Sequence, residues 1–284
     1  MSSLASSSVP VAYGRGNVKV CRRGCILVAA LDRPRVRNAF HDDLYLDLVD
    51  LLQEVADDSS IHALVLTGNG EFFSSGADVK GTSFQPRPEG RNTLQLPAGR
   101  FMMALIRFPK VLVAAVQGPA VGIAVTLLLH CDLVLCTPNA TFWAPFTRLA
   151  LVPELCSSVT FAERMGLAKA NELLLLGKQI DAQKAYDWNL CSQVVPDRTS
   201  NDPFHPSSLA MYACEQLEQH LLGLPQSART SAYFTKLIKG TRAPEMEEVC
   251  KRELLHLDDR FNRGDVQEAA LQLRRAMKRK QSRL

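Results

Sequence analysis

The sequence of 284 residues lacks the features that mark several classes of protein. No apolar run is long enough to span a bilayer, because polar and charged side chains interrupt the best stretch, at Arg107, Lys110, His130 and Asp132. The eight cysteines are scattered and no secretory signal precedes them, so we expect reduced thiols in the core rather than a zinc site or a disulfide framework. The net charge of +4 does not indicate a nucleic-acid partner, although it suits an anionic small molecule.

Acidic residues are also scarce in the middle of the chain. Between Gly90 and Ser158 the only carboxylates belong to Asp132 and Glu154. A carboxylate in apolar surroundings has its charged form disfavoured, so its proton affinity rises towards the range useful for a base. Glu154 is therefore either a buried structural acid or a base held for proton transfer. For Asp132 we expect a structural role.

Both ends of the chain have compositions that bear on targeting. Residues 1–16 are rich in serine and poor in acids, and a transit peptide would be more basic, so we expect a flexible leader. The last residues, Ser282, Arg283 and Leu284, form a conservative variant of the Ser-Lys-Leu signal that the peroxisomal import receptor reads. This ending predicts a peroxisome, or a related organelle such as a glycosome, with the mitochondrion as the alternative.

Strand and helix patterns alternate along residues 17–200. Short apolar runs predict strands at residues 18–21, 25–31, 62–67, 111–116 and 133–136. Helical periodicity or composition predicts helices at residues 41–56, 100–107, 121–130, 156–165, 167–176 and 181–188, with Asn189 in the left-handed conformation after the last one. We therefore predict an α/β core domain with parallel strands over residues 17–200, followed by a C-terminal helical region over residues 201–284.

Three segments carry residues suited to chemistry. Residues 74–80 (SSGADVK) follow a strand and a glycine-bearing turn, and their small side chains let a ligand approach the backbone closely. Residues 117–123 (QGPAVGI) turn from a strand into a helix, whose free N–H groups suit a developing oxyanion. Glu154 is the third element. The order and spacing of the three are more specific than any one of them.

Other candidate residues have simpler interpretations. His130, Cys131 and Asp132 lie at the end of an apolar helix, where a packed core is expected, so no metal site is predicted. Cys156 closely follows the acid of the third segment, but we expect no histidine to activate it as a nucleophile. Asp78 is expected to stabilise its turn or to cap the following helix.

These segments resemble the crotonase, or enoyl-CoA hydratase/isomerase, superfamily over residues 15–195, with a looser match in the C-terminal helices. The resemblance rests on residues 31–39 (LDRPRVRNA), 74–80, 117–123, 131–132 and 177–195 (GKQIDAQKAYDWNLCSQVV). Within the superfamily, residues 118–128 (GPAVGIAVTLL), 146–161 (FTRLALVPELCSSVTF) and the terminal SRL resemble the peroxisomal Δ3,Δ2-enoyl-CoA isomerases. The resemblance implies a crotonase-like ββα spiral core with C-terminal helices that form a homotrimer.

The resemblance also implies roles for individual residues. The two backbone N–H groups of the family's oxyanion hole fall on Ala77 and Ile123, and the isomerase base falls on Glu154. The hydratases use two carboxylates, whose places are held here by Thr126 and, roughly, Phe146. Hydration needs one group to activate water and another to manage the α-carbon proton, whereas a double-bond shift needs one base. The resemblance therefore favours isomerisation.

A bent coenzyme A is implied near residues 31–39 and 74–80. Arg35 and Arg37 are candidates for phosphate contacts, and the equal alternative is that both are solvated surface residues. The substrate is expected to contact the two small-residue loops at Ser75, Gly76, Asp78, Val79 and Gly122. Coenzyme A is part of the substrate, so neither a cofactor nor a metal is implied.

We therefore predict an isomerase that converts 3-enoyl-CoA to trans-2-enoyl-CoA in the β-oxidation of unsaturated fatty acids. An enoyl-CoA hydratase, or another crotonase chemistry such as dienoyl-CoA isomerisation, is an alternative, against which the missing acid at Thr126 argues. A non-catalytic acyl-CoA-binding protein is an alternative of another class. The presence of Glu154 together with both small-residue loops argues against it.

Overall fold

The computed structural model describes residues 8–79, 84–85, 90–196 and 198–281. The predictions for residues 1–7 of the leader, for the end of the 74–80 segment at residue 80 and for residues 282–284 lie outside the described part. The described residues form a seven-stranded sheet in the order β1-β2-β3-β4-β5-β7-β10. Its strands are β1 (Val11–Tyr13), β2 (Val18–Arg23), β3 (Ile26–Leu31), β4 (Ala63–Gly68), β5 (Val111–Val116), β7 (Leu133–Cys136) and β10 (Gln193–Val194).

Within this sheet, strands β3, β4, β5, β7 and β10 are parallel, which confirms the predicted α/β core. Every residue of β3, β4 and β5 is buried, as the continuous apolar runs of these strands require in a sheet that is covered on both faces. Strands β1 and β2 add an antiparallel edge. Because Val11–Tyr13 pair with Val18–Val20 in this edge, they belong to the sheet rather than to a flexible leader.

Alternate side chains of the strands enter two apolar clusters on the two faces of the sheet. Leu64 and Leu112 face one cluster together with α1 (Asp42–Asp57) and α2 (Pro97–Ile106), which pack against each other. Val65 and Val113 face the other cluster, which α7 (Leu209–Leu217) covers. This alternation is the period-2 pattern of a sheet buried on both sides.

A smaller three-stranded sheet has the order β6-β8-β9, and its strand β6 leads into the second small-residue loop. Its strands are β6 (Ala120–Val121), β8 (Thr141–Trp143) and β9 (Gln179–Asp181). The helix predicted over residues 121–130 begins only at Ile123. It consists of α3 (Ile123–Thr126) and a 3₁₀ segment, η4 (Leu127–His130), because Gly122 adopts φ 58° and ψ −122° ahead of it. Helices α4 (Ser157–Met165), α5 (Leu167–Leu174) and α6 (Ala182–Asp187) follow, and Asn189 is left-handed as predicted (φ 61°).

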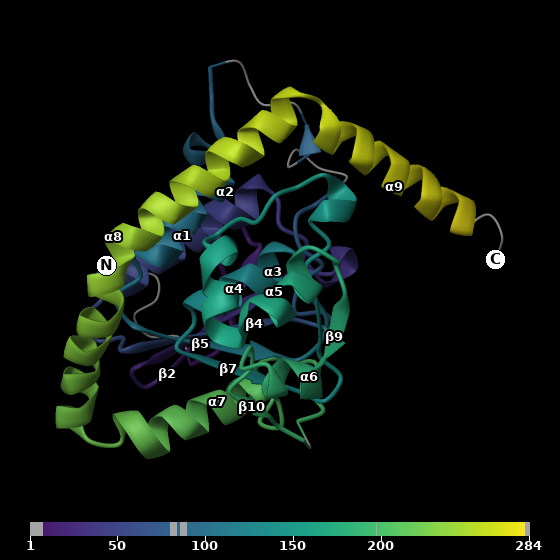
Figure 1. Cartoon of the computed structure of the whole chain (residues 1–284). Coiled ribbons are helices and arrows are strands. Elements are labelled where there is room, and N and C mark those ends of the chain that lie inside the picture. The colour runs from purple at the N-terminus through teal and green to yellow at the C-terminus, as the bar shows by residue number, and fades with distance from the viewer. Residues whose placement is uncertain (1–7, 80–83, 86–89, 197, 282–284) are drawn as a thin grey trace.

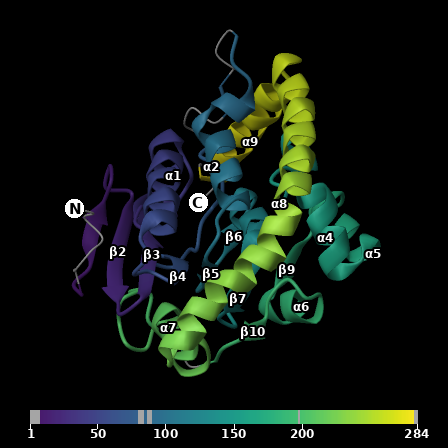
Figure 2. The same cartoon turned by 90° about the vertical axis from the view of Figure 1, so that its left-hand side faces the viewer.

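The C-terminal helices extend along the outside of the molecule. Helix α8 (Pro225–Asn262) runs up one side, and α9 (Asp265–Gln281) continues across the top (Figure 1). Figure 2 shows α8 from the side, where it packs against α2. The second half of α8 buries Met246, Cys250 and Leu254 in the same cluster as α1, so both predicted regions share one core. Among the described residues no helix combines the length and the apolar character needed to cross a membrane.

Candidate active site

The two small-residue loops predicted from the sequence lie side by side. Ser74 and Ala120 form a parallel bridge, and the Val121 N–H donates to the Ser74 carbonyl at 3.0 Å. Two residues further on, a Cβ atom added to Gly76 would lie 2.6 Å from the Val121 carbonyl oxygen. Gly76 itself has φ 80°, a left-handed conformation that glycine adopts without steric cost. These contacts bring the loop that leads into Ala77 against the loop that leads into Ile123.

The backbone N–H groups of Ala77 and Ile123 donate to no protein acceptor within the residues that the structure describes. Two neighbouring N–H groups are engaged: the Asp78 N–H donates to Phe40 O at 2.7 Å, and the Gly122 N–H donates to Trp143 O at 2.8 Å. An unpaired N–H on each of two adjacent loops can act as a pair of donors to one anionic oxygen. The two positions that the resemblance assigns to the oxyanion donors therefore lie on adjacent loops, and their part in catalysis stays a prediction.

Two buried amide side chains fix the 68–74 segment that leads into the first loop. The Asn38 Nδ2 group donates to Asn69 O at 3.0 Å and to Phe72 O at 2.8 Å. The Gln117 Nε2 group donates to Gly68 O at 2.9 Å and also to Phe72 O at 2.9 Å. Both amides lie within sequence motifs that carried the resemblance, but their bonding roles were not predicted.

Glu154 lies in the turn that precedes α4 and is partly buried. Its N–H donates to Ser157 Oγ at 3.0 Å, and its carbonyl accepts from the Ser157 N–H at 3.1 Å. The next two residues, Leu155 and Cys156, are left-handed, with φ 54° and 63°. Such conformations cost non-glycine residues about 1–3 kcal/mol each, and they concentrate at functional sites. The turn is therefore held by contacts from elsewhere in the fold.

Three distant residues supply those contacts. Glu253 of α8 accepts from the Cys156 N–H at 2.7 Å and from the Ser158 N–H at 2.8 Å. His130 Nε2 lies 3.0 Å from Leu155 O, which ties the turn to η4. The Cys156 thiol donates to the Met246 carbonyl at 3.1 Å. The sequence analysis did not predict Glu253 as a site residue.

A histidine that the sequence analysis did not place near Cys156, His130, interacts with its thiol. A hydrogen bond with Cys250 and a further one with His130 lower the pKa of the Cys156 thiol, against the opposing effect of burial. Cys156 is nevertheless fully buried, with 0% of its surface exposed. A thiol without solvent access is poorly placed to attack a substrate, so the histidine contact does not make it a nucleophile.

The two positions that the resemblance assigns to the hydratase carboxylates, Thr126 and Phe146, are not acids. Thr126 is completely buried, and its hydroxyl donates to Ile123 O at 3.2 Å within its own helix. Phe146 is 2% exposed and packs in the interior. No group of three or more His, Cys, Asp or Glu side chains with metal-binding geometry occurs in the described part of the chain.

The predicted coenzyme A contacts lie around the first loop. Arg35 and Arg37 are both exposed at the turn 34–37, and the Arg37 guanidinium stacks 5.0 Å from the Phe72 ring centroid. The Arg37 carbonyl accepts from the Ser75 N–H at 2.9 Å, which places this turn against the 74–79 loop. Arg274 of α9 reaches the same loop and donates to the Val79 carbonyl. The C-terminal helices thus contact the site of their own chain at both Val79 and Glu154's turn.

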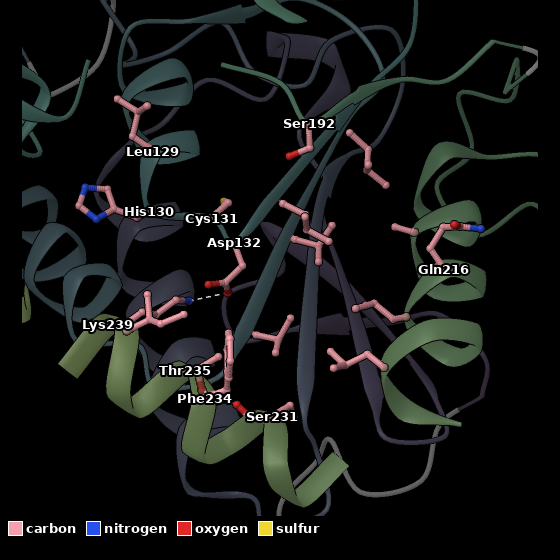
Figure 3. A pocket seen from close by; sticks show the side chains of 18 of the residues that line it. Leu129, His130, Cys131, Asp132, Ser192, Gln216, Ser231, Phe234, Thr235 and Lys239 are labelled. Atoms are coloured by element: carbon pink, nitrogen blue, oxygen red, sulfur yellow. Dashed lines mark hydrogen bonds and ion pairs between the residues drawn. The ribbon is translucent and has the colours of Figure 1, made fainter. Parts of the chain in front are cut away.

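A cavity of about 1110 Å³ lies between α7, α8, β5 and β7, and its lining includes His130 and Met246, which contact the Glu154 turn. None of the predicted substrate or catalytic residues lines it. Figure 3 shows Asp132 and Lys239 joined across its wall, at 2.6 Å between Oδ2 and Nζ. The Asp132 carboxylate also accepts from the Leu112 N–H at 2.7 Å, so its role is structural as predicted.

The model of the family described as "Enoyl-CoA hydratase/isomerase" matches residues 22–246, and the chain belongs to this family. It is 38% identical over 213 residues to Enoyl-CoA delta isomerase 2 of Rattus norvegicus, covering 70% of this chain and 54% of that protein. It is 37% identical to Enoyl-CoA delta isomerase 3, peroxisomal, of Mus musculus, covering 70% and 66%.

Solved structures agree with the family assignment. OdaA of Pseudomonas aeruginosa superposes with a TM-score of 0.80 at 32% identity, over 90% of this chain and 98% of that one. Other chemistries occur among the relatives: the 2,3-dehydroadipyl-CoA hydratase of Escherichia coli is 34% identical over 62% of this chain and 68% of its own length. The chain spans about half to two thirds of the length of the two delta isomerases.

Proposed function

We propose that this chain is an isomerase that shifts the double bond of a 3-enoyl-CoA to give trans-2-enoyl-CoA. The observation that carries the proposal is the combination of two N–H groups, at Ala77 and Ile123, that have no acceptor among the described residues, with Glu154 and with no acid at position 126 or 146. The similarity to proteins named enoyl-CoA delta isomerases supports the same conclusion.

In the proposed mechanism the thioester carbonyl accepts hydrogen bonds from the Ala77 and Ile123 N–H groups. The Glu154 carboxylate removes a proton from C2, and the negative charge of the resulting dienolate collects on the thioester oxygen. The protonated Glu154 then delivers a proton to C4, which leaves a C2–C3 double bond and restores the carboxylate. Removing one such oxyanion donor typically costs about 3–4 kcal/mol of transition-state stabilisation.

Isomerisation is favoured over hydration because it needs a single proton shuttle. Adding water requires one group to activate the water and another to protonate the α-carbon. The buried hydroxyl of Thr126 is bonded to its own helix and the Phe146 ring has no acid–base chemistry, so the second group has no counterpart at these positions. Hydration of 2-enoyl-CoA is therefore the second candidate reaction, and non-catalytic acyl-CoA binding is the third.

The cellular setting and assembly are parts of the same proposal. The terminal Ser282, Arg283 and Leu284 and the name of the mouse relative support import into a peroxisome and a role in the β-oxidation of unsaturated fatty acids. Exposed apolar side chains on α8, including Tyr233 and Leu237, which are both 72% exposed, support a homotrimer. No resident cofactor or metal takes part in the proposed reaction.

Incubating the purified protein separately with 3-enoyl-CoA and with 2-enoyl-CoA tests the proposal. The expected result is rapid formation of the conjugated 2-enoyl thioester from the first substrate and much slower hydration of the second. Absence of turnover with both substrates would exclude the enzyme, and hydration at a comparable or faster rate would make the hydratase the better assignment.

A further inference from the structure

The turn that carries Glu154 is connected to the rest of the fold by a short series of polar contacts. The Glu154 N–H donates to the Ser157 hydroxyl at 3.0 Å, and the Glu154 carbonyl accepts from the Ser157 N–H at 3.1 Å. Beyond it, the left-handed Leu155 and Cys156 reverse the chain into α4. Because neither residue adopts this conformation readily, the direction of the preceding side chain depends on whatever fixes these two residues.

The carboxylate of Glu253 fixes them from the neighbouring helix. Its Oε2 accepts from the N–H of Cys156, the residue that caps α4, and its Oε1 accepts from the N–H of Ser158, in the first turn of that helix. These N–H groups at a helix start have no partner within the helix. A carboxylate that bonds both of them supplies two charge-assisted hydrogen bonds and a favourable interaction with the helix dipole.

The Glu253 carboxylate that makes these bonds is buried. Glu253 is 6% exposed, and it lies on the apolar face of α8, between Cys250 and Leu257, which are in the main core. Burial raises the pKa of the Glu253 carboxyl, and its bonds with Ser158 oppose that effect. A carboxylate is rarely buried at a position suited to an apolar side chain unless its oxygens are bonded, and here both oxygens are bonded to the turn.

We propose that Glu253 is a positioning residue for Glu154: by clamping the backbone of Cys156 and Ser158, it holds the Glu154 carboxylate in the orientation needed for proton transfer. This inference rests on the proposed isomerase function. Glu253 acts through the turn and does not touch the substrate. Through Glu253, helix α8 helps to position the base of its own chain, although Glu253 lies far along the sequence from Glu154.

The substrate-binding loops do not depend on Glu253. Asn38 and Gln117 hold the segment before Ala77, and the bridge between Ser74 and Ala120 joins the two donor loops. Loss of Glu253 should therefore disturb the base while leaving the oxyanion donors in place. Misplacement of a reacting group by about 1 Å can lower the rate about 100-fold. We expect kcat to fall by about 10- to 100-fold, with KM for 3-enoyl-CoA changed less than about twofold.

Glu253→Gln is the decisive variant, because it preserves shape but turns an amide NH₂ group towards one of the two N–H donors. Glu253→Asp keeps the charge on a shorter side chain, and it should recover part of the lost kcat. Glu247→Gln is the matched control: Glu247 lies on the same helix and accepts two hydrogen bonds from Arg107, at 2.8 and 2.7 Å, away from the turn. Its kcat should equal that of the wild type.

A second readout is independent of activity. Cys156 is itself part of the clamped turn and is fully buried, so its alkylation by iodoacetamide, followed by peptide mass spectrometry, reports opening of the turn. Faster labelling in folded Glu253→Gln than in Glu247→Gln is expected. If wild-type protein fails to isomerise 3-enoyl-CoA, the proposed function falls, and the labelling still decides whether Glu253 holds the turn.

The proposal is overturned if folded Glu253→Gln keeps the wild-type kcat. It is also overturned if kcat falls only in proportion to the unfolded fraction, or if KM rises as much as kcat falls. Equal labelling of Cys156 in both variants would show that Glu253 does not hold the turn.

Discussion

Replacing Gly76 by alanine tests whether the close approach of the two donor loops is needed for catalysis. A Cβ atom at this position would lie 2.6 Å from the Val121 carbonyl oxygen and 3.2 Å from its carbonyl carbon. Both neighbours are backbone atoms, so neither can swing aside as a side chain would. The loops must separate until the Cβ···O contact reaches about 3.4 Å, where ordinary contact begins.

The cost of this change has two parts. Alanine at φ 80° loses about 1–2 kcal/mol relative to glycine because the left-handed region is disfavoured by its Cβ atom. Forcing the loops apart resembles overpacking of a core, which typically costs about 1–3 kcal/mol. We therefore expect the free energy of unfolding to fall by about 2–5 kcal/mol. The separation, close to 1 Å, displaces Ala77 from Ile123 and should lower kcat by about 100-fold.

Urea unfolding and the rate of 3-enoyl-CoA isomerisation measure the two effects. Gly16→Ala is the matched control, because Gly16 has φ 85° and no atom within 4 Å of an added Cβ. It should lose only the conformational part, about 1–2 kcal/mol, and keep its kcat. Wild-type kcat in folded Gly76→Ala, or an equal loss of kcat in both variants, would refute the reasoning.

Two further predictions concern stability. Asn38→Ala removes bonds to the carbonyls of Asn69 and Phe72. The Phe72 carbonyl keeps its bond from Gln117, whereas the Asn69 carbonyl loses its side-chain donor, so thermal or urea unfolding should show a loss of about 1–3 kcal/mol; a loss below about 0.5 kcal/mol would contradict this role. Glu247→Gln removes the ion pair with Arg107 and should cost about 0.5–1 kcal/mol at pH 7. Arg107 lowers the pKa of Glu247 in the folded state. The wild type should therefore be more stable than Glu247→Gln above about pH 4.5, and this difference in the free energy of unfolding should disappear as the pH falls through the folded-state pKa. A stability difference that persists at about pH 2 would contradict the assignment.

The sequence predicted the main strands well because their signals are local. Strands β5 and β7 have the predicted bounds, since each is a short apolar run with strong flanking breaks. The two small-residue loops could be located because glycines and preceding strand ends mark them, whereas the donor roles of Ala77 and Ile123 are implied by the resemblance and stay a prediction. Strands β6, β8 and β9 were missed, since each has only two or three residues and too few positions to show a period.

Residues that meet only through tertiary packing were not predicted. His130 reaches the turn at Leu155 because of the way η4 packs, and nothing near either residue in the sequence indicates the contact. Glu253 could have been recognised from the sequence as an acid at an apolar position of a helix. It falls among Val249, Cys250 and Leu254 on the apolar face of α8, where an acid needs bonded partners. The identity of those partners, the N–H groups before α4, required the structure.

The central claim is that Glu154 alone transfers the proton between C2 and C4. The most direct measurement is kcat for 3-enoyl-CoA isomerisation by Glu154→Gln, with KM and the unfolding midpoint recorded for the same preparation. General acid–base catalysis contributes about 100- to 10,000-fold, so kcat should fall within that range or further, while KM and stability stay close to those of the wild type. A kcat within a few-fold of the wild type would contradict the account.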